Sequence, residues 1–374
     1  MLCVSIILAS CKDNSSSSTT KTTDTDSATG TDVASMNPDT SMQAGILTPK
    51  GPKPDWGMNI APEMQVVIEK LMSYNSPPLI TLSATDARKQ PSPADAVKDV
   101  MKENNIPVPL SMVDTMGKNI PVSGGNIHLR IYTPKGEGPF PVILYYHGGG
   151  WVIADLDTYD ASARGLAEQT GAVLVSVAYR QAPEYKFPTA HNDSYAAYEW
   201  VLKNAASIKG DVKHVAVVGE SAGGNLATAV SMMARDKGIA IPVYQLLVYP
   251  IAGYDTITAS YQRNANAKPL DRPLMGWFFS KYLKSPADGK NPMISLVSAN
   301  LKGMPPTTII TAEYDPLQSD GEMLSEKLKA AGVTVNLKNY NGVTHEFFGM
   351  AAVVPAAKDA QAFAASELKN ALNK

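Results

Sequence analysis

The motif Gly-Glu-Ser-Ala-Gly-Gly occupies residues 219–224 and places a serine between glycines. An apolar run at residues 214–218 precedes it and predicts a buried strand, and a run rich in small residues at 225–234 follows and predicts a helix. A tight turn between the two would expose the serine hydroxyl at a helix N-terminus, where free N–H groups favour negative charge. The order strand, G-x-S-x-G, helix predicts that Ser221 is a nucleophile.

A serine hydroxyl becomes nucleophilic at neutral pH only with a base of suitable pKa beside it, which indicates a histidine. The chain has five histidines, and His345 comes just after the last predicted strand. Loops that follow parallel strands gather at one edge of the sheet, so His345 can reach Ser221 there. The other four are expected to be structural or exposed: His128, His147, His191 and His214. Of these, His147 is expected to support the glycine loop that follows it.

A carboxylate must orient the imidazole and stabilise its cation. Asp315 directly follows the predicted strand 307–312, and Glu313, one step nearer the strand, is the alternative. The chain order Ser221, Asp315, His345 is the order found in α/β-hydrolases. Asp315 is therefore the predicted acid.

Nucleophilic attack on an ester produces an oxyanion, which needs N–H donors already in place. The segment 147–151, His-Gly-Gly-Gly-Trp, follows a predicted buried strand, and its glycines allow backbone amides to approach a ligand closely. The predicted oxyanion-hole donors are the amides of Gly148, Gly149 and Ala222.

These residues require a sheet whose strands end at a common edge. Continuous apolar strands alternate with helices along the chain, which predicts an α/β fold with a mostly parallel central sheet and helices on both faces. The pattern at 126–132 indicates an outer strand. The remaining predicted strands are 140–146, 171–179, 214–218, 242–249, 307–312 and 333–337, and the predicted helices are 158–170, 189–204, 225–234, 321–331 and 355–372.

Two segments interrupt this alternation. Residues 52–110 contain helical patterns at 62–72 and 92–103, which we interpret as a cap; a small independent bundle is the alternative. Residues 111–374 form the predicted catalytic domain, with a second cap segment inserted at about 252–304. Its aromatic helix at 277–283 either packs in the core or lines an apolar acyl pocket.

Composition excludes several classes of function. The chain has 33 basic and 35 acidic residues among 374, a net charge of −2, so no nucleic-acid partner is expected. Its two cysteines, Cys3 and Cys11, both lie near the N-terminus, which excludes a disulfide framework or a cysteine-based metal site in the body. No metal or cofactor is predicted.

The N-terminus predicts export. Residues 1–10 form a short apolar run typical of a signal peptide, and Leu-Ala-Ser-Cys at 8–11 resembles a bacterial lipobox that would make Cys11 the lipidated residue. The Ser/Thr-rich segment 11–51 is then a disordered tether. These patterns predict secretion across the inner membrane and an envelope lipoprotein that contacts the membrane only through its anchor; a cleaved ordinary signal or an unprocessed end are the alternatives. The sequence leaves a homodimer open.

Several motifs together resemble the hormone-sensitive lipase family of esterases (bacterial family IV). They lie at 147–151, 179–184, 187–188, 219–227, 315–317 and 345–347, and the likeness extends from about residue 54 to the C-terminus. The resemblance implies an α/β-hydrolase fold with a helical cap and a serine carboxylesterase that prefers short to medium acyl chains. Two positions differ from the usual family pattern: Glu220, where Asp or Thr is common, and Ala154, where glycine is usual.

The function thus predicted is hydrolysis of small-molecule carboxylic esters through an acyl-serine intermediate. Deacetylation of carbohydrates, or cleavage of other small esters and amides by the same three residues, is one alternative. A non-catalytic small-molecule binding protein on the same fold is an alternative of another class.

Overall fold

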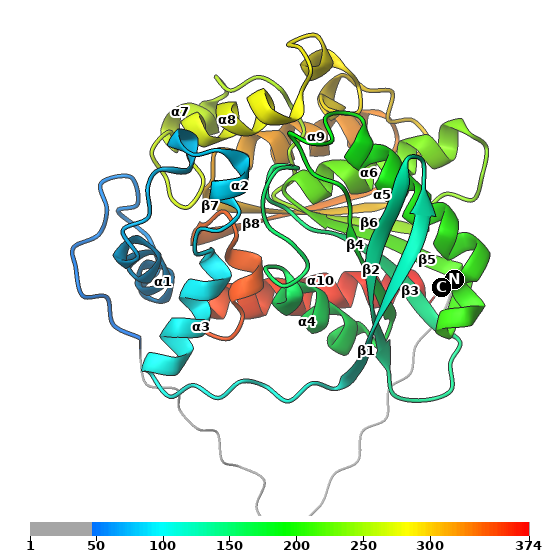
Figure 1. The fold of residues 1–374 in the computed structure, drawn as a ribbon, viewed down its shortest axis with the longest axis horizontal. Coiled ribbons are helices and arrows are strands. Elements are labelled where there is room, and N and C mark those ends of the chain that lie inside the picture. The colour runs from blue at the N-terminus through cyan, green and yellow to red at the C-terminus, as the bar shows by residue number, and fades with distance from the viewer. Residues whose placement is uncertain (1–46, 374) are drawn as a thin grey trace, which may run out of the picture. The chain divides into compact units, whose positions relative to one another are not determined.

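A computed structural model describes residues 47–373 of the chain. Its centre is an eight-stranded sheet with the order β1-β2-β4-β3-β5-β6-β7-β8 (Figure 1). The β1–β2 and β2–β4 pairs are antiparallel, and every other pair is parallel. The strands are β1 Val113–Val122, β2 Gly125–Pro134, β3 Phe140–Tyr146, β4 Val173–Ala178, β5 Gly210–Glu220, β6 Tyr244–Val248, β7 Thr307–Tyr314 and β8 Val335–Thr344. The predicted α/β fold with a mostly parallel central sheet is confirmed.

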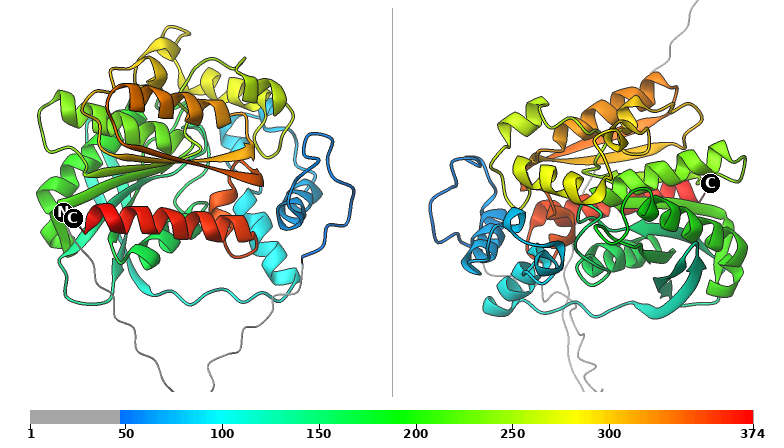
Figure 2. Two further views of the ribbon diagram at one scale, coloured as in Figure 1. Left: turned by 180° about the vertical axis from the view of Figure 1, so that it is seen from behind. Right: turned by 45° about the horizontal axis from the view of Figure 1, so that its top comes forward.

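Helices cover both faces of this sheet (Figure 2). On one face α4 (Asp160–Thr170) packs with α10 (Pro355–Leu372), and on the other α6 (Ala222–Asp236) packs with α5 (Thr189–Asn204) beside α9 (Gln318–Ala330). Short 3-10 turns complete the body: η2 Ala205–Ile208 and η5 Phe347–Met350.

The central strand β3 shows why the sequence forms this layered core. Its residues are apolar on both sides because each face of the sheet is covered by helices. Val142, Leu144 and Tyr146 belong to the apolar cluster with α5 and α6. Ile143 and Tyr145, which alternate with them, belong to the cluster with α4 and α10.

Two further groups of short helices lie outside this alternation. The N-terminal group contains α1 Pro62–Ser73, η1 Leu79–Thr81, α2 Ala84–Ala87 and α3 Pro93–Glu103, and Figure 1 shows its α-helices together at one side of the body. The second group lies between β6 and β7: α7 Ala259–Arg263, α8 Arg272–Tyr282, η3 Asp288–Lys290 and η4 Leu296–Ser298. The two groups meet where η1 contacts α8. We call them together the cap.

The N-terminal helices are not an independent bundle. α1 contacts α3, but it also contacts β8, and α3 contacts η5. Two backbone amides just before α1 donate hydrogen bonds to the body. Asn59 N donates to the side-chain Oη of Tyr314 at 2.9 Å, and Ala61 N donates to Gly342 O at 2.8 Å. The described residues, 47–373, all belong to one compact unit.

Several details differ from the sequence predictions, among them β8, which was predicted at 333–337 and runs from Val335 to Thr344. β1, which the sequence analysis did not predict, pairs with β2 as a hairpin and takes the edge position, so the strand predicted to be the outer one lies second in the sheet. Most β1 side chains are exposed, and the strand therefore lacks the apolar pattern of the buried ones.

The end of the predicted tether also differs. Its described part, residues 47–51, packs against α1: Glu69 accepts hydrogen bonds from Lys50 N at 2.8 Å and Gly51 N at 3.0 Å, and Leu47 is buried. The predicted signal peptide, Cys11 and the rest of the tether lie outside the described residues. Within residues 47–373, none of the helices combines the length and the apolar character needed to cross a bilayer.

The turn between β5 and α6 packs without room for side chains at its glycines. A Cβ at Gly223 would lie 1.9 Å from Tyr146 O, and a Cβ at Gly219 would lie 2.0 Å from Gly223 O. Since one neighbour is a backbone atom of β3 and the other a backbone atom of α6, neither can move without moving a strand or a helix.

We expect Gly223→Ala to lower the free energy of unfolding by at least about 3 kcal/mol, because the clash forces β3 and α6 apart. The matched control is Gly276→Ala, on the exposed face of α8, where a Cβ meets no atom within 4 Å. That substitution should raise stability by up to about 1 kcal/mol through helix propensity. Urea unfolding of the two variants measures both effects, and similar stabilities for them would contradict the packing argument.

Candidate active site

Ser221 lies at the junction of β5 and α6 in a conformation that side chains rarely adopt. Its φ is 55° and its ψ is −117°, and its N–H donates to Val248 O at 2.9 Å. Strain of this kind costs about 1–3 kcal/mol and persists only where the surrounding structure enforces it. The tight glycine packing described above enforces it here, and it directs Oγ away from the sheet toward a cavity.

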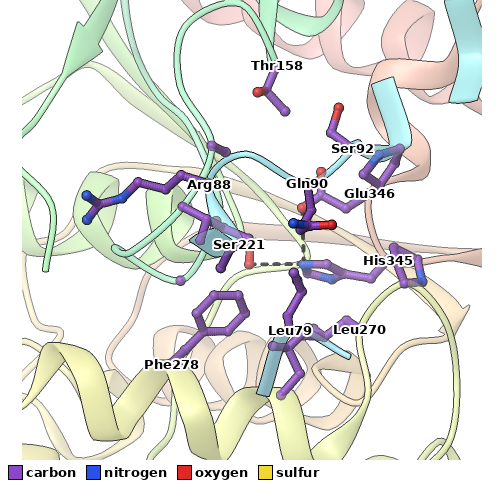
Figure 3. A pocket seen from close by; sticks show the side chains of 18 of the residues that line it. Leu79, Arg88, Gln90, Ser92, Thr158, Ser221, Leu270, Phe278, His345 and Glu346 are labelled. Carbon is purple, nitrogen blue, oxygen red and sulfur yellow. Dashed lines mark hydrogen bonds and ion pairs between the residues drawn. The ribbon is translucent and has the colours of Figure 1, made fainter. Parts of the chain in front are cut away.

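His345 and Asp315 complete a chain of hydrogen bonds with Ser221. Figure 3 shows the contact between His345 and Ser221. The Nε2 atom of His345 lies 3.0 Å from Ser221 Oγ, and its Nδ1 lies 2.7 Å from Asp315 Oδ2. His345 follows directly after β8, and Asp315 directly after β7. The parallel strands β5, β7 and β8 therefore deliver the three predicted residues to the same edge of the sheet.

The charges around His345 favour its protonated form. Burial by itself would lower the pKa of His345, but the carboxylates of Asp315 and Glu346 outweigh it and raise this pKa above the ordinary value of 6.5. The Nδ1 contact to Asp315 leaves Nε2 to take a proton from Ser221. This arrangement can transfer a proton from a serine hydroxyl to an imidazole and stabilise the resulting cation.

The loop that carries Asp315 is held by residues of the cap. The buried Asn264 donates both amide hydrogens, to Glu313 O and Asp315 O at 2.9 Å each. Ser260 Oγ donates to Pro316 O at 2.5 Å. The alternative carboxylate, Glu313, is occupied elsewhere, accepting from Gly342 N at 2.7 Å. The structure thus brings Asp315 to His345, and Glu313 does not take that place.

The other histidines have structural contacts. His147 stacks on Tyr179 with ring centroids 4.3 Å apart, and burial lowers the pKa of His147 to about 4. His191 is buried between Tyr282 Oη, 2.7 Å from Nδ1, and Asn225 Oδ1, 3.0 Å from Nε2. Two more contact single partners nearer the surface: His128 lies 2.8 Å from Asn119 Oδ1, and His214 lies 2.8 Å from Asp211 Oδ2.

The glycine loop after β3 borders the same cavity as Ser221. Gly149 and Gly150 line the cavity, with φ values of 91° and 58° that favour glycine, whereas Gly148 lies behind the wall. A Cβ at Gly148 would lie 2.2 Å from Tyr159 Oη, so this glycine makes room for a tyrosine. Ala222 is the first residue of α6, immediately after the serine.

The cavity over Ser221 has a volume of about 130 Å³. Its floor presents Ser221, His345 and Glu346, and its walls come from both parts of the cap. The largest apolar side chains that the cap contributes to these walls are Leu79 from η1, Leu270, and Leu274 and Phe278 from α8. In the aromatic helix, Trp277 and Phe279 pack in the core, as one of the two interpretations expected, while Phe278 lines the cavity. That this cavity receives an acyl group stays a prediction.

Two carboxylates and three tyrosines beside His345 were not assigned a role from the sequence. Glu220 accepts hydrogen bonds from Tyr145 Oη and Tyr249 Oη, and Glu346 accepts one from Tyr159 Oη at 2.6 Å. The sequence offered two signals, the uncommon glutamate before Ser221 and the glutamate directly after His345. Neither indicates the tyrosines, which come from three separate segments.

Among residues 47–373 there is no group of three or more His, Cys, Asp or Glu side chains arranged to hold a metal ion.

Comparisons with known proteins agree with this geometry. Residues 143–349 match a family described by the alpha/beta hydrolase fold. The chain is 42% identical to Carboxylesterase NlhH of Mycobacterium tuberculosis over 253 residues, which cover 66% of this chain and 79% of that protein. It is 31% identical to Ethyl acetate hydrolase of Pseudomonas putida, covering 81% of this chain and 96% of that one.

Solved structures of esterases also resemble this chain. A thermostable esterase from Pseudomonas putida ECU1011 superposes with a TM-score of 0.78 at 35% identity, covering 86% of this chain and 99% of that one. A hyperthermophilic esterase from Pyrobaculum calidifontis superposes with a TM-score of 0.76 at 35% identity, covering 83% and 98%.

Proposed function

Because the chain belongs to the alpha/beta hydrolase family, and within it to the esterases that resemble hormone-sensitive lipase, we propose that Ser221, His345 and Asp315 carry out its carboxylic ester hydrolysis. The family relationship makes the protein a carboxylic ester hydrolase. The assignment of the three residues is supported by one observation above all: Ser221 Oγ, His345 and Asp315 are joined by hydrogen bonds of 3.0 and 2.7 Å.

The proposed reaction has two stages. In the first, Ser221 Oγ attacks the ester carbonyl carbon while His345 Nε2 takes its proton, and the tetrahedral intermediate collapses as His345 returns that proton to the departing alcohol. In the second, His345 deprotonates a water molecule, which attacks the acyl-serine and releases the carboxylic acid and Ser221. Asp315 holds the imidazole and stabilises its cation in both stages.

The developing oxyanion is proposed to bind backbone amides beside Ser221. Gly149 and Ala222 remain in this proposal as the sequence analysis placed them. The sequence analysis predicted the amide of Gly148 as a further donor. We propose the amide of Gly150 instead, because Gly150 borders the cavity whereas Gly148 packs on Tyr159.

The cavity supports a preference for small esters. Its volume of about 130 Å³ is close to that of an engineered cavity of about 150 Å³ that holds one benzene molecule. We propose that acyl groups of about two to four carbons fit, and that Phe278 limits longer ones. This substrate range lies at the short end of the one that the family resemblance implied.

Two further proposals concern the N-terminus and assembly. The lipobox-like segment 8–11 supports lipidation of Cys11 after export across the inner membrane, and hence an anchor in a bacterial envelope as the one membrane contact. We also propose that the protein assembles as a homodimer. This proposal comes from the sequence analysis and not from a contact within residues 47–373.

Replacing the nucleophile tests the central assignment. Ser221→Ala should lower kcat for p-nitrophenyl acetate and butyrate by at least roughly a thousandfold, since the acyl-serine cannot form. Ser231→Ala, in the same helix, removes a hydroxyl that donates to Ala227 O and should leave kcat within about twofold. Turnover by Ser221→Ala at the wild-type rate would refute the nucleophile.

An acyl-chain series tests the cavity. Wild-type kcat/KM should be highest for acetate to butyrate esters and fall for longer chains. Phe278→Ala should raise the ratio of octanoate to acetate kcat/KM by roughly tenfold or more, because one methylene in an apolar pocket contributes about 1–3 kcal/mol. Phe363→Ala, on α10 away from the cavity, is the control. An unchanged ratio in Phe278→Ala would exclude Phe278 as the limit.

Metabolic labelling tests the anchor. When the full chain is expressed in a bacterium with labelled palmitate, the wild type should carry label and sediment with membranes. Cys11→Ser should lose both properties and keep its esterase activity, whereas Cys3→Ser should keep all three. Label that survives in Cys11→Ser would contradict lipidation at this cysteine.

A further inference from the structure

A second carboxylate lies on the side of His345 that faces Ser221. Glu346 Oε1 is 3.7 Å from His345 Nε2, the nitrogen that contacts Ser221 Oγ, whereas Asp315 contacts Nδ1 on the opposite side of the ring. Glu346 also lines the cavity over Ser221 and is one-fifth exposed there (Figure 3). The imidazole thus lies between two carboxylates, and the esterase mechanism proposed above uses only one.

The position of Glu346 is tightly determined. Its backbone adopts a φ of 70°, in the left-handed region, and its carboxylate accepts the hydrogen bond from Tyr159 Oη at 2.6 Å. Tyr159 Oη in turn occupies the space that Gly148 leaves free by having no side chain. Strain at a residue that the surrounding contacts hold in place is a common feature of functional sites.

Glu220 lies close behind this carboxylate. Glu220 and Glu346 both line one small cavity of about 20 Å³. Tyr249 links the two sides of the cluster, because its hydroxyl donates to Glu220 while its ring lies 4.4 Å from the His345 ring. Among residues 47–373, His345 is the one basic side chain within 4 Å of either carboxylate.

We propose that Glu346 is a positioning residue for the proposed ester hydrolysis, holding His345 beside Ser221 and stabilising the imidazolium that forms when Ser221 attacks. The proton moves from Ser221 Oγ to His345 Nε2, so the new N–H lies on the side of Glu346. A fixed carboxylate there interacts more strongly with the cation than with the neutral ring, which is the requirement for lowering a barrier.

The sign of the effect on pH dependence follows from the charges. A negative Glu346 favours the imidazolium and so raises the pKa of His345, and burial raises the pKa of Glu346 itself. Burial, with the charge of Glu346 next, raises the pKa of Glu220 to about 7. Activity requires neutral His345, and it falls as the pH drops through the pKa of His345. The ionisable groups that face Glu346 are His345, Asp315, Glu220, Tyr145, Tyr159, Tyr179 and Tyr249.

The test is the pH dependence of kcat/KM for p-nitrophenyl butyrate between pH 5 and 9, in wild type and Glu346→Gln. The wild-type acid limb should have its midpoint above 6.5, the ordinary histidine value. In Glu346→Gln the midpoint should fall by roughly one unit, and the plateau rate should fall by up to roughly tenfold, since the imidazolium loses one stabilising charge. Glu367→Gln, a partly buried glutamate on α10 that is absent from the cavity lining, should show neither change.

The two readouts separate positioning from a structural role. A variant that only loosened the site would lower the plateau and leave the midpoint in place, and that result in Glu346→Gln would overturn the proposal. Tyr159→Phe gives a second test, because it keeps the Glu346 carboxylate but removes its hydrogen bond. Glu346 then ionises less readily, and the midpoint should fall by a smaller amount.

If Glu346→Gln fails to fold or has no measurable rate, Tyr159→Phe decides: an unmoved midpoint would overturn the proposal, and a lowered one would support it. Failure here is distinct from failure of the esterase assignment. An active Ser221→Ala would refute the assignment, whereas an active Glu346→Gln with the wild-type midpoint would refute only the role of Glu346.

Discussion

The close approach of the β5–α6 turn to the end of β3 is the constraint on which the rest of the site depends. Gly223 packs so tightly on Tyr146 O that any side chain there would meet backbone. This contact fixes Ser221 in its strained conformation and places it beside the glycine loop that continues β3. The proposed nucleophile and the glycine amides that border its cavity are therefore positioned by the same junction, and the distance between them is set by the sheet.

The cap contributes to this site in two ways. It supplies the apolar walls of the cavity through Leu270, Leu274 and Phe278. It also holds the loop that carries Asp315, because Asn264 donates to the carbonyls of Glu313 and Asp315. Because one segment both bounds the substrate space and supports Asp315, a change in cap packing would affect substrate choice and proton transfer together.

The electrostatics of the site follow from its burial. His345 has two carboxylates on opposite sides and a tyrosine ring against its face, all largely removed from water. Charges interact more strongly in such surroundings than in water, so small changes in the ionisation of Glu346 or Glu220 act directly on the imidazole. The tyrosine hydroxyls that donate to these carboxylates lower the cost of burying them.

The sequence by itself determined the strands β2 to β8, the helices that cover them and the residues proposed as nucleophile, base and acid. These depend on local patterns: apolar runs, glycines around Ser221, and single polar residues just after strands. It did not show β1, whose exposed residues carry no apolar pattern, or that Gly150 borders the cavity where Gly148 does not. Only the tertiary structure showed that Asp315, and not Glu313, contacts His345, and that Glu220, Glu346 and their tyrosines gather around this histidine. Such contacts join segments far apart in the chain, and their distances depend on how the whole sheet and cap pack, which no local pattern records.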